Sequence, residues 1–178
     1  MRSWSRHEIL AFAVPNKGMD EYAIQRGSTY VNKVFGYDKM VFKSDQEPAI
    51  ISYLECVKSH AGNQIMCEHS PVGDSKSDGE IENAVQEIQG QFRSIKGDLE
   101  SSYGNKVPPE HPSLPWLVTH AAMCVFRYKV GPDGRTAYHR LKGKRFDRNV
   151  VKFGECVFYL KLKSKGRFKA DSRWGLGV

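Results

Sequence analysis

The chain has 178 residues, of which 40% are hydrophobic and 26% are charged. This balance is typical of a globular protein and excludes a disordered one. No apolar run reaches the roughly 18 residues of a membrane span, and the N-terminal residues do not have the pattern of a signal peptide. The scattered cysteines argue against a disulfide scaffold and a zinc finger, and favour a nuclear or cytoplasmic location with reduced thiols: Cys56, Cys67, Cys124 and Cys156.

The charge is distributed unevenly along the sequence. Residues 1–126 hold 12 Lys and Arg against 16 Asp and Glu, a net of −4, whereas residues 127–178 hold 15 against 4, a net of +11. A basic C-terminal region following a mildly acidic body indicates a polyanionic partner, most simply nucleic acid. A surface that only improves solubility is the alternative.

The first part of the chain predicts alternating strands and helices. Asp20 is placed to cap a helix that Gly36 ends, and Pro48 suits the first turn of the next helix, which Gly62 ends. In order, we predict a strand within His7–Pro15, a helix between Asp20 and Gly36, a strand at Lys39–Lys43, a helix between Pro48 and Gly62, and a strand at Gln64–Cys67.

A long helix is predicted over Ser75–Leu99. Ser77 is a suitable N-cap and Glu80 completes a capping box. Apolar residues then recur at helical spacing and predict a buried stripe: Ile81, Ala84, Val85, Ile88, Phe92, Ile95 and Leu99. Beside it lies a second stripe, which we call the polar stripe: Glu82, Gln86, Gln89, Arg93 and Lys96.

The pattern changes after this helix. A connector rich in proline and glycine leads to another helix starting at Pro115, which the Gly131–Gly134 turn ends. Beyond it we predict β-like segments at Arg135–Lys142, Gly154–Lys163 and Arg167–Val178, with Phe153, Val157, Phe158 and Trp174 forming their core. The sequence therefore predicts an α/β core at residues 1–131 and a small, basic, β-rich module at residues 132–178.

Two carboxylates are candidates for a metal site. Asp45 follows a predicted strand, where functional groups of α/β sheets often lie, and Glu82 falls in the first turn of the long helix. Each has an ordinary explanation, a solvated turn for Asp45 and compensation of the helix dipole for Glu82. Together they could hold Mg²⁺, which favours one or two carboxylates with phosphate oxygens and water. The spacing alone leaves the geometry open.

The two acidic segments resemble known motifs. FKSDQEPAI is similar to the SDxGPxF-type segment of retroviral and retrotransposon integrases, and SKSDGEIENAVQEIQ is similar to their helix bearing the last acid of the D,D-35-E triad. Between Asp45 and Glu82 lie 36 residues, one more than the family spacing. The resemblance covers nearly the whole chain. It implies a ribonuclease-H-like integrase core, a partial mixed sheet flanked by helices, followed by a small β-rich tail.

The resemblance also assigns roles to residues. Asp45 and Glu82 would be the second and third catalytic acids, ligating two Mg²⁺ or Mn²⁺ ions that drive DNA strand transfer. Gln86 and Gln89 would contact DNA, with Arg93 and Lys96 extending that surface. A solvated helix face is the alternative for both glutamines. In the tail, the residues expected to bind DNA phosphates are Arg140, Lys142, Lys144 and Arg145.

One departure from the family limits these expectations. The first catalytic aspartate of the family has no counterpart here, because Asp20 and Asp38 lie too late and fit caps or turns better. We therefore expect a fragment or a remnant of an integrase that is inactive as this chain. Because family members work as multimers, the resemblance implies a homo-oligomer.

Three functions remain open at this stage. The first is an integrase core and tail that perform metal-dependent strand transfer in a longer parent. The second is a non-catalytic module for nucleic-acid binding or assembly derived from an integrase. The third is a ribonuclease H-type nuclease, which the long helix and the tail disfavour. Membrane association is not expected.

Overall fold

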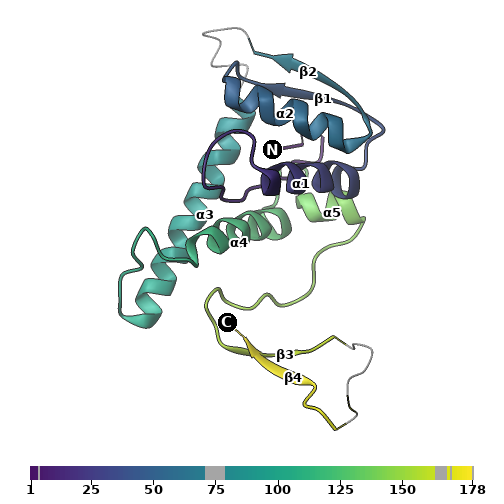
Figure 1. The fold of residues 1–178 in the computed structure, drawn as a ribbon. Helices are drawn as coiled ribbons and strands as arrows, with labels where there is room; N and C mark the ends of the chain where they lie inside the picture. Colours follow the sequence, from purple (N-terminus) through teal and green to yellow (C-terminus); the bar gives the residue numbers. More distant parts are fainter. Residues whose placement is uncertain (4, 71–78, 163–167, 169, 178) are drawn as a thin grey trace.

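The computed structural model describes residues 1–3, 5–70, 79–162, 168 and 170–177, and shows a mixed α/β fold (Figure 1). The elements in chain order are α1 (Glu21–Tyr30), the π-helix η1 (Val31–Phe35), β1 (Lys39–Ser44), α2 (Pro48–Ala61), β2 (Gln64–His69), α3 (Gly79–Tyr103), α4 (Leu114–Tyr128), α5 (Ala137–Lys142), β3 (Val157–Leu160) and β4 (Trp174–Gly177).

Strands β1 and β2 form a parallel pair, in which Lys39 lies opposite Gln64 and Ser44 opposite His69. Helix α2 makes the crossover that a parallel connection requires. One face of the pair packs with α1, η1 and α2 around a buried cluster: Val31, Phe35, Phe42, Leu54, Val57, Ala61 and Ile65. On the other face Val41 and Met66 are 52% and 66% exposed. The first core therefore covers only one side of the sheet.

The local signals predicted for this half are confirmed. The carboxylate of Asp20 accepts a hydrogen bond from the backbone N–H of Ala23 at 2.8 Å, which caps α1. Gly36 and Gly62 adopt the left-handed conformation, with φ of 61° and 70°, where η1 and α2 end. Pro48 occupies the first turn of α2. The strands predicted at Lys39–Lys43 and Gln64–Cys67 form and extend slightly beyond their predicted ends.

Helices α3 and α4 pack together around a second core, which consists of Ile9, Ala84, Ile88, Ala121 and Ala122. The predicted apolar stripe of α3 is buried only in part, because Ile81 and Val85 are 40% and 49% exposed. The helix runs to Tyr103, beyond the predicted end at Leu99. The predicted N-cap, Ser77, lies outside the described residues.

The apolar N-terminal run within His7–Pro15 is not a strand, which corrects the prediction. Only an isolated antiparallel bridge joins Arg2 to Ile9, beside backbone hydrogen bonds between Met1 and Leu10. The run instead contributes Ile9 and Leu10, both buried, to the interior. Burial of these two side chains accounts for the apolar pattern without a regular ladder.

A second correction concerns Arg135–Lys142, which we predicted as β-like. This segment contains the short helix α5, whose N-cap Thr136 accepts a hydrogen bond from the backbone N–H of His139 at 3.1 Å. Gly143, with φ of 70°, ends the helix. The Tyr138 ring meets Phe126 of α4 at a centroid distance of 5.7 Å. Packing against α4 thus stabilises a helix at this position.

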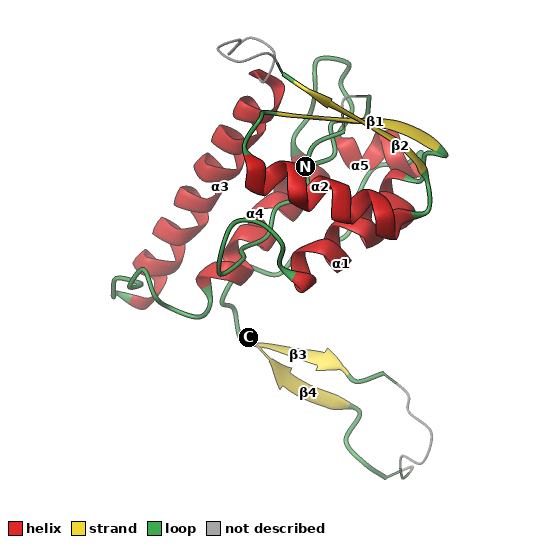
Figure 2. Cartoon of the chain, turned by 45° about the horizontal axis from the view of Figure 1, so that its top comes forward, coloured by secondary structure: helices red, strands yellow, loops and turns green. Residues whose placement is uncertain are grey.

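The C-terminal strands β3 and β4 form an antiparallel pair, with Val157 opposite Gly177 and Leu160 opposite Trp174. In both views this hairpin projects away from the helices (Figures 1 and 2). Phe158 and Trp174 are 73% and 56% exposed, so they do not form the predicted core of the tail. None of the described helices is long and apolar enough to cross a membrane.

Candidate nucleic-acid interface

Asp45 lies directly after β1, at the carboxyl end of the parallel pair. Its side chain is exposed, and Oδ1 accepts a hydrogen bond from the backbone N–H of Glu47 at 3.2 Å. The end of β2 lies beside it, because Gln46 Nε2 donates to the carbonyl of Ser70 at 3.1 Å. Asp45 is therefore at the edge where ligands of parallel sheets bind, and it also stabilises the turn before α2.

Glu82 lies in the first turn of α3 and is exposed. Its neighbour Glu80 pairs with Arg2, whose Nη2 is 3.2 Å from Oε2 and whose Nη1 donates to the Glu80 carbonyl at 3.0 Å. Within the described ranges Glu82 itself forms no ion pair. The convergence of the two carboxylates therefore stays a prediction.

The metal site inferred for Asp45 and Glu82 stays a prediction. Among them, no group of three or more His, Cys, Asp or Glu side chains is placed to hold an ion. Two exposed carboxylates supply the oxygen donors that Mg²⁺ prefers, but an ion held by them alone would need most of its ligands from water or phosphate.

The polar stripe of α3 divides into an open and a paired part. Gln86, Gln89 and Arg93 are exposed. Lys96 forms an ion pair with Glu100, and this hydrogen bond, together with one from the backbone N–H of Val107, lowers the pKa of Glu100 to about 2. The charge of Lys96 is thus compensated within the protein, whereas that of Arg93 is available to a ligand.

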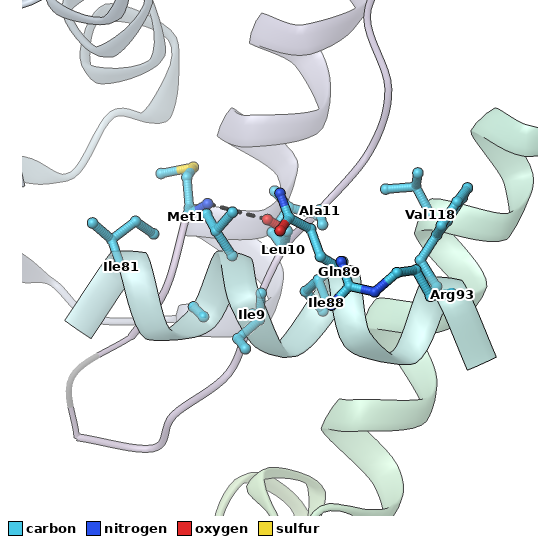
Figure 3. A pocket seen from close by; sticks show the side chains of 12 residues that line it. Met1, Ile9, Leu10, Ala11, Ile81, Ile88, Gln89, Arg93 and Val118 are labelled. Atoms are coloured by element: carbon cyan, nitrogen blue, oxygen red, sulfur yellow. Dashed lines mark hydrogen bonds between the residues drawn. The ribbon is translucent and has the colours of Figure 1, made fainter. Parts of the chain in front are cut away.

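Gln89 and Arg93 also border an apolar cleft of about 390 Å³ between α3, α4 and the N-terminal segment (Figure 3). Figure 3 shows both side chains on α3 beside Ile88. Apart from these two, the residues that line the cleft are apolar: Met1, Ile9, Leu10, Ala11, Ile81, Ala84, Val85, Ile88, Phe92 and Val118. Gln89 and Arg93 are therefore the polar side chains of an otherwise apolar cleft.

The basic segment Arg140–Arg145, like the polar stripe, has one cation in an ion pair and others that are open to solvent. Arg140 is held by Asp133, with Nε donating to Oδ2 at 3.1 Å, and its side chain is only 14% exposed. This interaction lowers the pKa of Asp133 to about 2. Lys142, Lys144 and Arg145 are exposed and form no ion pair with any described residue. These three cations, close together at the end of α5, are available for phosphate contacts.

A larger cleft, of about 870 Å³, lies between the end of α3, α4 and residues 150–157. Its apolar lining includes Trp116, which is 73% exposed, and Phe153, whose ring lies 5.3 Å from that of His120. Burial lowers the pKa of His120, with a further contribution from Arg127. Sequence reasoning did not predict this cleft, because it forms from three segments that are distant in the chain.

Comparison with known proteins identifies no family for the chain. No protein-family model matches it, and no curated protein matches it at a significant level.

Proposed function

We propose that this chain binds DNA through its basic C-terminal region, and that it derives from a retroelement integrase. The observation that carries the proposal is the group of exposed cations Lys142, Lys144 and Arg145, which form no ion pair within the described part of the chain and lie in a region of net charge +11. Cations that have no counterion within the protein displace the ions condensed on the phosphates of DNA. The release of these ions drives binding that depends little on the DNA sequence.

The order of the first elements supports the proposed descent. Parallel strands β1 and β2 are joined by α2, and α3 follows, with Asp45 directly after β1 and Glu82 in the first turn of α3. An integrase core would place its second and third acids in this way. On this proposal, β1 and β2 belong to a ribonuclease-H-like mixed sheet, and metal-dependent strand transfer belongs to a parent that supplies a further carboxylate.

DNA binding is tested by fluorescence anisotropy of a labelled 30-base-pair duplex titrated with the full chain at several salt concentrations. The variant combines Lys142→Ala, Lys144→Ala and Arg145→Ala. If each of these side chains contacts one phosphate, the slope of log K against log salt should fall by about 0.9 per lost contact. The affinity at low salt should fall with it.

A matched control removes the same charge from the acidic body. Lys17, Lys33 and Lys58 lie outside the basic region, and their joint replacement by alanine should leave the salt slope of the parent unchanged. Equal losses of affinity in both triple variants would show a non-specific effect of net charge and would contradict the proposed interface.

The β3–β4 hairpin offers a second measurement. Removal of residues 156–178 deletes basic residues but leaves α5 and its contacts with α4 and Arg6 in place. We expect weaker DNA binding and little change in the thermal unfolding of the remainder. Unchanged affinity and unchanged salt slope would exclude the hairpin from the interface.

Strand transfer is tested separately, with labelled donor and target DNA in the presence of Mn²⁺. We expect no product from this chain alone, since two carboxylates do not make a two-ion site. A metal-dependent product that Glu82→Gln abolishes would contradict this expectation.

A further inference from the structure

Strand β1 has one edge that pairs with no described strand. The carbonyls of Asp38 and Ser44 accept hydrogen bonds from the backbone N–H groups of Gln64 and Ser70, at 3.0 and 2.8 Å. Every second residue from Asp38 to Ser44 therefore directs its backbone N–H and C=O toward β2. Because backbone groups alternate along a strand, the N–H and C=O groups of Lys39, Val41 and Lys43 face the opposite edge. Among the described residues, β1 pairs with no strand other than β2.

A cleft of about 420 Å³, which we call the edge cleft, opens along this unpaired edge. All residues from Lys39 to Lys43 line it, and the opposite wall is formed by the N-terminal segment, including Met1, Arg2 and Ser5. That wall is itself an extended edge. Met1 and Leu10 exchange backbone hydrogen bonds of 3.1 and 2.9 Å. The next residue, Arg2, lies opposite Ile9. Because the direction of the backbone groups alternates along an extended segment, Arg2 directs its N–H and C=O away from Ile9.

The two sides of the edge cleft differ in chemistry. Its inner side is apolar, since Phe35, Phe42 and Leu54 of the first core line it. On the outer face of β1, Lys39 and Lys43 flank Val41, and within the described ranges neither lysine forms an ion pair. Met1 and Ile81 line both this cleft and the apolar cleft of Figure 3, so the two are adjacent.

We propose that the edge cleft binds an extended segment of a partner protein, which adds to β1 as a further strand. Unpaired backbone donors and acceptors on both walls favour an extended backbone over a compact ligand. The segment carries apolar side chains toward the inner side and acidic side chains opposite Lys39 and Lys43, because opposite charges on neighbouring strands attract. This inference does not depend on DNA binding.

The probe is a fluorescein-labelled peptide of four Val-Glu repeats, titrated with the full chain and followed by anisotropy. A peptide of four Val-Lys repeats has the same length and the same apolar positions with reversed charge. We expect saturable one-to-one binding of the Val-Glu peptide and at least tenfold weaker binding of the Val-Lys peptide. Absence of binding at about 1 mM chain would overturn the proposal.

Val41→Pro tests the backbone contact. The N–H of Val41 faces the cleft and is not used by β2, so proline removes a donor of the free edge while the β1–β2 ladder is retained. We expect at least a tenfold loss of peptide affinity. His69→Pro is the matched control, because by the same alternation the N–H of His69 faces the outer edge of β2. Equal affinity of Val41→Pro and the parent chain would contradict strand addition.

A charge exchange keeps the test independent of any loss of folding. In a double variant with Lys39→Glu and Lys43→Glu, the preference should reverse, with the Val-Lys peptide binding at least tenfold more tightly than the Val-Glu peptide. An unchanged preference would overturn the proposed register. Light scattering of the parent chain and of Val41→Pro measures their oligomeric states. A dimer of the parent that Val41→Pro abolishes would assign the cleft to a second copy of the chain and overturn the proposed partner.

Discussion

The guanidinium of Arg2 contacts Glu80 at two points, with Nη2 3.2 Å from the carboxylate Oε2 and Nη1 donating to the backbone carbonyl at 3.0 Å. Arg2 thereby joins the N-terminal segment to the first turn of α3. The side chain of Arg2 is 13% exposed and that of Glu80 is 42% exposed, so water is excluded from this contact mainly on the arginine side. Since Glu82 is in the same turn, the contact also positions the start of the helix that carries the candidate acid.

Arg2→Ala should lower the free energy of unfolding by about 1–3 kcal/mol, because it leaves the partly buried Glu80 carboxylate without its ion pair. Urea denaturation measures this change. Lys33→Ala, at an exposed position, is the control and should stay within about 0.5 kcal/mol of the parent. A similar effect from both substitutions would show that the Arg2 contact contributes little.

Glu8 should make stability depend on pH. Its side chain is fully buried; burial raises the pKa, and the Arg6 guanidinium and the Ser3 hydroxyl act in the opposite direction. A raised pKa in the folded state means that the native protein binds more protons than the unfolded chain, so stability falls as pH rises above about 4.5, the ordinary pKa of the group.

Glu8→Gln removes this titration and preserves the shape of the side chain. Relative to the variant, the parent should therefore lose stability between pH 4 and pH 7, as measured by thermal unfolding at each pH. Glu110→Gln, at an exposed position, should leave the pH profile of the parent intact. Parallel profiles for the parent and Glu8→Gln would rule out this role of Glu8.

Helices α1 and α2 approach closely at Gly27. A Cβ atom at this position would overlap Tyr53 Oη and lie 2.9 Å from Val57 Cγ2, whereas Gly97 of α3 has nothing within 4 Å. Alanine is favoured over glycine in a helix by about 0.8–1 kcal/mol, but overpacking costs about 1–3 kcal/mol.

We therefore expect Gly97→Ala to raise the melting temperature and Gly27→Ala to lower it, in the same calorimetric measurement. The pair separates helix propensity from packing, because both substitutions make the same chemical change within an α-helix. Stabilisation by both would show that Tyr53 moves aside without cost.

Asp45 and Glu82 should respond to metal if they share an ion. Millimolar Mg²⁺ or Mn²⁺ should then raise the melting temperature slightly, because an ion bound only by the folded state stabilises it by mass action. Glu82→Gln should abolish this shift, and Glu110→Gln should retain it. Equal shifts in both variants and the parent would count against a shared site.

The local sequence determined the ends of several elements. Asp20, Gly36, Pro48 and Gly62 mark helix ends as predicted, because capping and left-handed turns depend on a side chain and its nearest neighbours. Thr136 carried a comparable signal for α5, which the β-like interpretation overlooked. A short helix is marginal by itself, and here contacts with α4 and Asp133 stabilise it.

Features that depend on distant segments were decided by the tertiary structure alone. The apolar residues of α3 have the right period, yet Ile81 and Val85 remain exposed, since burial depends on which elements cover each turn. The sequence Lys39–Lys43 predicts a strand but not its neighbours. Hydrogen bonds between strands join residues that are far apart in the chain, so only the folded arrangement shows that one edge of β1 is paired and the other faces a cleft.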